Sequence, residues 1–340
     1  MFGGYPTSLG RAFLELGWKV HYFDDEENLH KLNKYSRNKY LFRLFWPQMA
    51  KIVQKLLIDE IGHINPTALL IIKGFYYSPV TIKKIKFNYP HIKLLHFNPD
   101  NTFNTWHFGN SNNWIRSSIN MYDIHFTWGQ FLFDELFKNG AKKIYYLPFA
   151  CDTHLHQPCI RNDDEMDLYE SDISFVGSWD NEREWWLSQI VDFDLKIWGN
   201  GWNKANKKLK LKWQRKEVVG NDFSKVCFYS KININIIRKQ NIPAHNMRTF
   251  EIPGCKGFVL STRTTEQANL FVEGEEIACF DTPEELRNKI NSFLKEKRMR
   301  EKIAQNSYRK IIGEHTYLER AREIENILYK SFEDDKKSNS

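Results

Sequence analysis

The chain has 340 residues, of which 41% are hydrophobic and 15% aromatic, and it carries a net charge of +7. This composition excludes the disordered and fibrous classes, and the length suits two domains of roughly 100 to 200 residues each. A net positive charge suits anionic partners such as nucleotide diphosphates, lipid-linked phosphates or nucleic acid, but the charge alone does not distinguish among these partners.

Hydrophobic runs in the sequence are short. None approaches the roughly 18 residues of a membrane span, and the first twenty residues lack the features of a secretory signal, so we expect a cytoplasmic protein. The five cysteines are an odd number without a C-x-x-C pair, which fits neither a disulfide framework nor a zinc site. We expect them to be ordinary buried thiols.

The first half of the chain alternates apolar runs with helical patterns, which is typical of a parallel sheet with crossover helices. Helices are expected over 8–17 and 130–140, each closing on a glycine. Almost nothing precedes the first of these, so the first strand of the domain is reduced or missing, or the start codon lies late. The predicted strands are residues 19–25, 68–74, 93–98, 123–128 and 143–150.

An acidic, polar segment at 161–172 separates this half from a second α/β half. A helix after residue 281 is well marked, with Thr282 as N-cap, Pro283 in its first turn and Glu285 three after the cap. The predicted strands of this half are residues 173–177, 195–199, 232–237, 257–262 and 276–280.

These patterns predict an α/β protein of two Rossmann-like α/β/α domains that face each other across a cleft. Ligands of such sheets bind beyond the carboxyl ends of the strands, so the site is expected between the domains. We expect an N-terminal domain over 1–165, a second domain over 166–315, a helix over 316–330 that crosses back to the first domain, and a disordered tail over 331–340.

The stretch "AHNMRTFEIPGCKGFVL" (244–260) gives the strongest local signal. Asn246 is a plausible N-cap, Pro253 keeps the helix short, and Arg248 and Glu251 fall on one face of it. An arginine near a helix N-terminus suits a phosphate, and a carboxylate accepts hydrogen bonds from vicinal ribose hydroxyls. The alternative is a surface ion pair worth about 0.3 kcal/mol.

The segment "NMRTFEIPGCKGFVLSTRTTEQANLFVEGEE", with "HTYLERAREI" downstream, resembles the C-terminal domain of the GT-B glycosyltransferases, specifically the spore-protein CgeB-like branch. "ISFVGSWDNEREWWLSQI", "LKIWGNGW" and "YYLPFACDTHLHQP" resemble the same branch, and the likeness covers residues 5 to 330. The resemblance implies that Glu251 binds the donor ribose. Retaining relatives carry a second glutamate eight residues earlier, where this chain has Pro243, so the stereochemical outcome stays open.

Further residues are expected around the donor. "FVGSWDNER" places a glycine at a strand end and an arginine near a helix start, where both can meet a pyrophosphate, although a turn glycine and a surface arginine would look the same. The threonines of "STRTTE" could cap phosphate oxygens, and the tryptophan of "WGNGW" could lie near the base or simply pack. The expected donor-binding residues are Gly177, Arg183, Gly199, Trp202, His245, Asn246, Arg248, Glu251, Thr264 and Thr265.

The residues that bind the acceptor of the sugar are expected in "FNPDNTFNTWHFGNSNNW" (97–114), which follows a predicted strand. Asp100 or His107 could take the proton of an acceptor hydroxyl as general base, although a strand-end aspartate often only forms a turn. No metal site is predicted, because histidines do not cluster with carboxylates or thiols and no Asp-x-Asp signature stands at a strand end.

The resulting hypothesis is a metal-independent glycosyltransferase without a cofactor. Its partners are a nucleotide diphosphate sugar and a saccharide or other glycan acceptor; nucleic acid is not expected, and peripheral membrane contact through a basic surface is left open. Two alternatives remain: a catalytically silent saccharide-binding or coat-assembly protein of the same fold, and a nucleotide-sugar epimerase, which shares the architecture.

Overall fold

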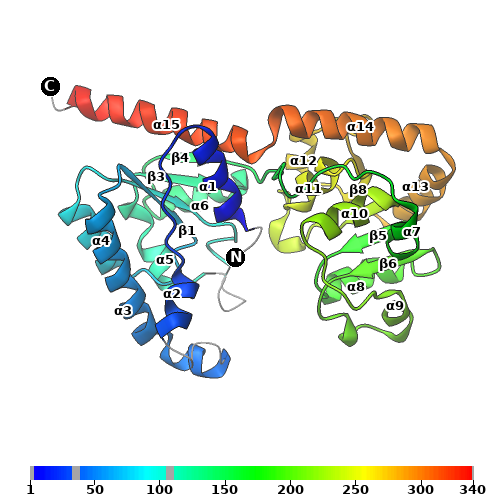
Figure 1. Cartoon of the computed structure of the whole chain (residues 1–340), viewed down its shortest axis with the longest axis horizontal. Helices are drawn as coiled ribbons and strands as arrows, with labels where there is room; N and C mark the ends of the chain where they lie inside the picture. Colours follow the sequence, from blue (N-terminus) through cyan, green and yellow to red (C-terminus); the bar gives the residue numbers. More distant parts are fainter. Residues whose placement is uncertain (1–3, 33–38, 105–110, 339–340) are drawn as a thin grey trace. The chain divides into compact units, whose positions relative to one another are not determined.

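The computed structural model describes residues 4–32, 39–104 and 111–338 (Figure 1). Contacts between residues divide the chain into two compact units. We call Lys19–Pro148 the N-terminal unit, and Phe149–Ser340 together with Met1–Trp18 the C-terminal unit. Each unit has a parallel sheet of its own, so the predicted α/β class with two parallel-sheet units is confirmed.

The N-terminal unit is built on strands β1 (Ala68–Ile72), β2 (Lys93–Phe97), β3 (Ile124–Thr127) and β4 (Ile144–Tyr146). They pair in this order and all run parallel, because a helix-containing crossover joins each strand to the next. The described helices of this unit are α2 (Asp25–Leu32), α3 (Lys39–Ile64), α4 (Pro79–Asn88), α5 (Asn113–Ser117) and α6 (Phe133–Lys138).

The strand predicted over 19–25 is wrong, because residues 18–24 adopt neither helix nor strand. Lys19, His21 and Tyr22 are exposed, so this apolar-looking run does not enter the sheet. The Asp24 carboxylate accepts a hydrogen bond of 2.8 Å from the backbone N–H of Glu27. This N-terminal hydrogen bond favours a helical turn where the strand was expected.

The C-terminal unit has a five-stranded parallel sheet in the order β6-β5-β7-β8-β9. The predicted strands of this half all form: β5 (Ser171–Val176), β6 (Leu195–Trp198), β7 (Ser230–Asn235), β8 (Val259–Thr262) and β9 (Ala278–Phe280). Helices cover both faces of this sheet (Figure 1), which explains its nearly continuous apolar strands. The helices are α7 (Asp163–Tyr169), α8 (Asn181–Ser188), α9 (Lys207–Lys212), α10 (Asn221–Tyr229), α11 (Arg248–Gly254), α12 (Thr265–Leu270), α13 (Pro283–Lys295) and α14 (Lys297–Glu314).

Two helices distant in sequence complete this unit. α1 (Tyr5–Glu15) lies beside α15 (Tyr317–Ser338), where the rings of Tyr5 and Tyr317 meet edge to face with centroids 5.5 Å apart. The indole of Trp18 donates a hydrogen bond of 2.6 Å to the Glu325 carboxylate. The tail expected to be disordered from residue 331 is helical up to Ser338, because α15 continues with Lys336 and Lys337 in its last turn, where cations suit the helix dipole.

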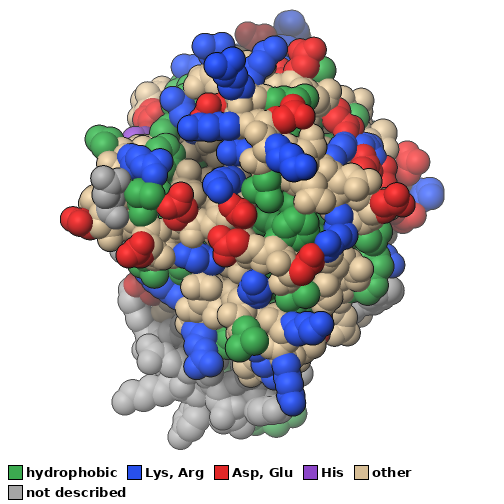
Figure 2. Space-filling model, turned by 90° about the vertical axis from the view of Figure 1, so that its right-hand side faces the viewer, with side chains coloured by type: hydrophobic (Ala, Val, Ile, Leu, Met, Phe, Trp, Pro, Cys, Tyr) green, Lys and Arg blue, Asp and Glu red, His purple; other side chains and the backbone are tan. Residues whose placement is uncertain are grey.

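The surface of the C-terminal unit carries charges of both signs. On the face that Figure 2 draws, acidic side chains lie among the basic ones over most of the area. The net charge of +7 is therefore not gathered into one continuous basic face on this side, as a nucleic-acid-binding surface would require. No helix in the described parts of the chain is both long enough and apolar enough to cross a membrane.

Gly254 allows α11 to approach the loop that enters the C-terminal unit. A Cβ atom added at Gly254 would overlap with the Sγ atom of the buried Cys151. We therefore expect Gly254→Ala to lower the free energy of unfolding by about 1 to 3 kcal/mol, through overpacking. The measurement is urea unfolding followed by circular dichroism.

Gly313, in α14, provides the matched control, since an added Cβ atom meets nothing within 4 Å there. Gly313→Ala should raise stability by up to about 1 kcal/mol, because alanine favours helix more than glycine does. Cys151→Ala should relieve most of the loss caused by Gly254→Ala. Equal effects of both glycine substitutions would contradict the steric explanation.

Candidate functional site

The carboxyl ends of β5, β7 and β8 meet at one edge of the C-terminal sheet, as they must in a parallel sheet. Gly177 follows β5, Arg238 lies three residues after β7, and Thr264 lies two residues after β8. The short helix α11 begins at Arg248 between the last two of these strands. The fold therefore brings most of the predicted donor-binding residues to a single sheet edge.

Asn246 fixes the start of α11. Its Oδ1 atom accepts hydrogen bonds from the backbone N–H and the hydroxyl of Thr249, at 3.2 and 3.3 Å. Its amide nitrogen donates to Oδ1 of Asn235 at the end of β7, at 2.8 Å. The first helical residue is Arg248, one later than an N-cap at Asn246 implies, but the Asn246 side chain does perform the capping. Pro253 lies in the last turn of this seven-residue helix.

Glu251 and Arg248 form an ion pair in which the carboxylate is buried and the arginine side chain is 32% exposed. Glu251 is only 4% exposed, and Nη1 of Arg248 donates to its Oε2 atom. The Arg248 guanidinium also lies over the Phe223 ring, 4.4 Å from the centroid, and Nε faces the Val176 carbonyl at 3.4 Å. A carboxylate buried this deeply is costly without a cation, so the surface-pair alternative does not describe this site.

His156 is the second neighbour of the Glu251 carboxylate, with 3.8 Å between Nε2 and Oε1. The backbone N–H of Asp152 donates to Nδ1 of His156 at 3.3 Å, which leaves the ring proton on Nε2, facing Glu251. Burial lowers the pKa of His156, although the Glu251 charge opposes this effect. The sequence offered no signal for His156, because it lies 95 positions before the glutamate that it faces.

Two further arginines, Arg183 and Arg238, lie close to this ion pair. Nη1 of Arg183 donates to the Ser178 carbonyl at 2.8 Å, and Arg238 donates through Nε to the Asp180 carboxylate at 2.7 Å. Burial, reinforced by the charges of Arg238 and Arg248, lowers the pKa of Arg183 to about 10. The mutual repulsion of these cations would be relieved by a bound anion.

Sequence reasoning missed two members of this cluster, Asp180 and Arg238. Asp180 also caps α8, accepting a hydrogen bond of 2.8 Å from the backbone N–H of Arg183. A capping aspartate three residues before an arginine is a detectable signal in "DNER". Arg238 could have been found as a cation just beyond the apolar run of β7.

The two predicted glycines lie at neighbouring strand ends. The backbone N–H of Gly177 donates to the Trp198 carbonyl at 2.9 Å, and Gly199 has a φ of +125°. A Cβ atom at Gly199 would overlap with the Gly177 carbonyl oxygen, so glycine is required for this close approach. The ends of β5 and β6 are thereby held together at the sheet edge, and the backbone N–H of Gly199 donates to the Lys216 carbonyl at 2.9 Å.

The Trp202 side chain is not exposed at the sheet edge. Its side chain is fully buried in the core, and its indole N–H donates to the Gly177 carbonyl at 2.8 Å. The expectation that it lies beside a base is therefore replaced by the packing alternative. The tryptophan instead positions Gly177 through this hydrogen bond, because a buried indole N–H must find an acceptor.

The remaining donor-side residues differ in exposure. Thr264 is buried and its hydroxyl caps α12 by accepting from the Gln267 N–H at 3.3 Å, whereas Thr265 is exposed. His245 is fully buried: Nε2 accepts from the Phe149 N–H at 3.3 Å, and Nδ1 lies 3.5 Å from the Glu266 carboxylate. Burial lowers the pKa of His245. These contacts give His245 and Thr264 clear roles in holding the local structure.

The acceptor-side candidates belong to the N-terminal unit. Asp100 follows β2, and its carboxylate accepts a hydrogen bond of 2.7 Å from Nζ of Lys73. Its backbone N–H donates to Oδ1 of Asn98 at 3.0 Å, as in a turn. His107 lies outside the described residues.

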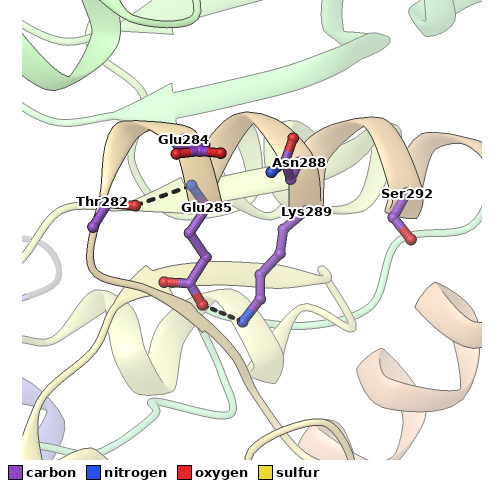
Figure 3. Close-up of a pocket in the computed structure, with 6 residues that line it drawn as sticks. All are labelled: Thr282, Glu284, Glu285, Asn288, Lys289 and Ser292. Carbon is purple, nitrogen blue, oxygen red and sulfur yellow. Dashed lines mark hydrogen bonds and ion pairs between the residues drawn. The ribbon is translucent and has the colours of Figure 1, made fainter.

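Two surface hollows lie away from these residues. One runs along α13 (Figure 3), where the Thr282 hydroxyl caps the Glu285 N–H at 3.1 Å, as predicted, and Glu285 pairs with Lys289 at 2.9 Å. The other lies beside α4 in the N-terminal unit. Within the described ranges, no group of three or more His, Cys, Asp or Glu side chains could hold a metal ion.

Residues 183–326, less than half of the chain, match a protein-family model described as "Glycosyl transferase-like". No curated protein matches the chain significantly. Many solved structures do match, among them sucrose-phosphate synthase from Thermosynechococcus elongatus, with a TM-score of 0.67 and 10% identity over 97% of this chain and 94% of that one.

Two further structures extend this comparison. A glycosyltransferase from Rickettsia africae has a TM-score of 0.64 and 14% identity, covering 94% of this chain and 92% of that one. Anabaena HepE, solved in complex with UDP-glucose, has a TM-score of 0.60 and 10% identity over 82% of each chain. At these identities the likeness shows the fold, which is that of the GT-B glycosyltransferases.

The family match and the fold together support a transferase that acts on sugars.

Because Glu251 is buried, we expect the stability of the protein to depend strongly on Arg248, the cation that pairs with it. We expect Arg248→Met to lower the free energy of unfolding by about 2 to 3 kcal/mol at pH 7.5, because a buried carboxylate is left without its charged partner. The double variant Arg248→Met/Glu251→Gln should lose clearly less than the sum of the single losses. Urea unfolding of the four proteins measures this coupling.

Arg322 and Glu319 on α15 provide the control, since they form an ion pair with the same three-residue spacing and their side chains are 49% and 32% exposed. Arg322→Met should cost less than about 0.5 kcal/mol. A loss of similar size at Arg248 would mean that the Arg248–Glu251 pair is not specially stabilised by burial.

Proposed function

We propose that this protein transfers a sugar from a nucleotide diphosphate sugar to a saccharide or other glycan acceptor. The observation that carries the proposal is the cluster of Arg183, Arg238 and Arg248 beside the buried Glu251 carboxylate, at the carboxyl edge of a parallel sheet. This is a cationic site next to a carboxylate, as a diphosphate joined to a ribose would require. The UDP-glucose complex of Anabaena HepE supports a donor of this class.

Each residue would have a distinct part in donor binding. The three guanidinium groups would bind the diphosphate, and Gly177 and Gly199 would shape the neighbouring strand ends without side chains in the way. When the diphosphate engages Arg248, both oxygens of Glu251 become acceptors for the vicinal hydroxyls of the ribose. Asn246 would position Arg248 through the helix start, and Thr265 offers an exposed hydroxyl near the same sheet edge.

In the reaction, the bond between the anomeric carbon and the diphosphate oxygen breaks while a bond to the acceptor oxygen forms. The leaving diphosphate gains negative charge, which the arginine cluster would stabilise without the help of a metal ion. The acceptor hydroxyl loses its proton, and we propose Asp100 as the base, with His107 as the second candidate. Lys73 would hold the Asp100 carboxylate in place through their 2.7 Å ion pair.

The two domains would have separate roles in the reaction. We propose that residues 1–165 serve the acceptor and 166–315 the donor, that helix 316–330 braces the first domain, and that closure of the domains excludes water from the donor. We also propose membership of the CgeB-like branch, a place in polysaccharide biosynthesis, a cytoplasmic location and peripheral membrane contact through a basic surface.

Two rival functions fit the same fold. A silent saccharide-binding protein is favoured by Pro243, which stands where retaining relatives carry a glutamate. A nucleotide-sugar epimerase is favoured by the similarity of the fold to that of a solved UDP-N-acetylglucosamine 2-epimerase. An epimerase needs paired acid and base groups around the sugar ring, whereas the carboxylate described here lies among arginines that suit a diphosphate.

Nucleotide binding tests the donor site. We expect Glu251→Gln and Arg238→Ala each to weaken the binding of UDP or GDP at least tenfold in calorimetry, whichever of the two the wild-type protein binds. Glu275→Ala, in an exposed loop, is the matched control and should leave affinity unchanged. Unchanged affinity in both site variants, with folding verified by circular dichroism, would remove this sheet edge as the donor site.

Turnover tests the reaction. Incubation with a panel of nucleotide sugars should release nucleoside diphosphate slowly with the wild-type protein, because water can replace the acceptor. Asp100→Asn should lower transfer to an acceptor about a hundredfold or more while nucleotide affinity stays the same. Absence of any release would favour the binding protein, and conversion of the sugar without release of diphosphate would favour the epimerase.

A further inference from the structure

The outward face of α4, in the N-terminal unit, combines exposed apolar and basic side chains. Val80 is 74% exposed and Phe87 is 84% exposed, which is unusual for an aromatic residue. Lys83 and Lys84 lie between them in sequence and are exposed as well. We call Val80, Lys83, Lys84 and Phe87, together with Lys142 described below, the α4 surface.

Helix geometry forces this exposure. α4 starts after Ser78, whose hydroxyl accepts from the Thr81 N–H at 3.3 Å, and Pro79 occupies its first turn. The opposite face is buried through Thr81, Ile82 and Ile85. Residues 80, 83, 84 and 87 are spaced by three, four and seven, so they share the face that points away from the core.

A hollow beside the helix extends the basic character of this surface. Its lining consists of Lys83, Lys86, Phe87, Asn120, Met121 and Lys142. Lys86 is paired with Asp123 at 2.5 Å, whereas Lys83, Lys84 and Lys142 form no ion pair with any described residue. Three lysine charges are therefore available to an external anion.

The hollow is held in shape by a tight turn. Gly140 has a φ of +87°, and a Cβ atom added there would lie 2.9 Å from Cβ of Asn120. This close packing fixes the segment that carries Lys142 against the segment of Asn120 and Met121. The backbone segments that carry the lining lysines are thereby held next to one another.

We propose that the α4 surface docks on a membrane of anionic phospholipids. Phe87 and Val80 would enter the interface between headgroups and acyl chains, and the lysine ammonium groups would contact lipid phosphates, one of them in the hollow. A protein partner fits less well, because the centres of protein interfaces are depleted of lysine. The inference extends the membrane contact proposed above and does not depend on sugar transfer.

Helix α9, in the C-terminal unit, offers an internal comparison. Its exposed lysines are Lys207, Lys208 and Lys210, but Leu211, 85% exposed, is the one highly exposed apolar side chain on the helix. It is basic without a pair of apolar side chains that could insert together. The lysine substitutions in α9 therefore match those in α4 in charge, and L211S, like F87S, replaces a highly exposed apolar side chain with serine.

The experiment is co-sedimentation of the full chain with vesicles at 0.1 M salt. Vesicles of phosphatidylcholine with 30% phosphatidylglycerol are compared with pure phosphatidylcholine. We expect the wild-type protein to bind the anionic vesicles at least tenfold more tightly than the neutral ones. K83E/K84E should weaken binding to the anionic vesicles tenfold or more, since each basic residue contributes roughly fivefold, and F87S should weaken it about fivefold. K207E/K208E and L211S should change binding less than threefold.

Each other outcome overturns the proposal. Equal losses of vesicle binding in the α4 and α9 variants would show that the net charge of the protein alone attracts it to the membrane. Equal binding to neutral and anionic vesicles would exclude the proposed contacts with anionic lipids. If the wild-type protein is a dimer on size exclusion and F87S is a monomer, the surface is a protein interface. Calorimetry with UDP or GDP on K83E/K84E reports the donor site separately, so failure of membrane docking and failure of the proposed transferase remain distinguishable.

Discussion

The burial of the Glu251 carboxylate is the constraint on which the candidate site depends. A carboxylate that is 4% exposed must be compensated, and the compensating charge comes from Arg248 on the same helix, while the His156 ring lies 3.8 Å from the carboxylate. To make both contacts, α11 has to be short, start at a fixed residue and lie against the loop that enters the unit. Asn246, Pro253 and Gly254 each meet one of these requirements.

The arginine cluster adds a second, opposing constraint. Burial first, and then the nearby charges of Arg238 and Arg248, lower the pKa of Arg183, an arrangement that costs stability in the absence of an anion. Asp180 offsets part of this cost while it caps α8. Unfavourable electrostatics of this kind are common at functional sites, since the ligand supplies the missing charge.

The strands of the C-terminal sheet were predictable because they are buried on both faces and read as apolar runs between turn residues. The cap of α13 was predictable too, since Thr282, Pro283 and Glu285 are adjacent in sequence. The strand prediction for residues 19–25 was wrong, because alternation of apolar and polar residues does not show whether a neighbouring strand is present to pair with them. The position of the Trp202 side chain was not predictable for a related reason. A tryptophan in a glycine-rich turn can face a ligand or the core, and tertiary packing decides between these orientations.

By itself the sequence determined the α/β class, the order of most strands and helices, and the pairing of Arg248 with Glu251, because each depends on spacing within a few residues. Only the tertiary structure decided that Glu251 is buried, that His156 faces it, and that Arg238 and Asp180 join Arg183 at one sheet edge. Those contacts join residues far apart in the chain, and they follow from the parallel arrangement of strand ends rather than from any local pattern.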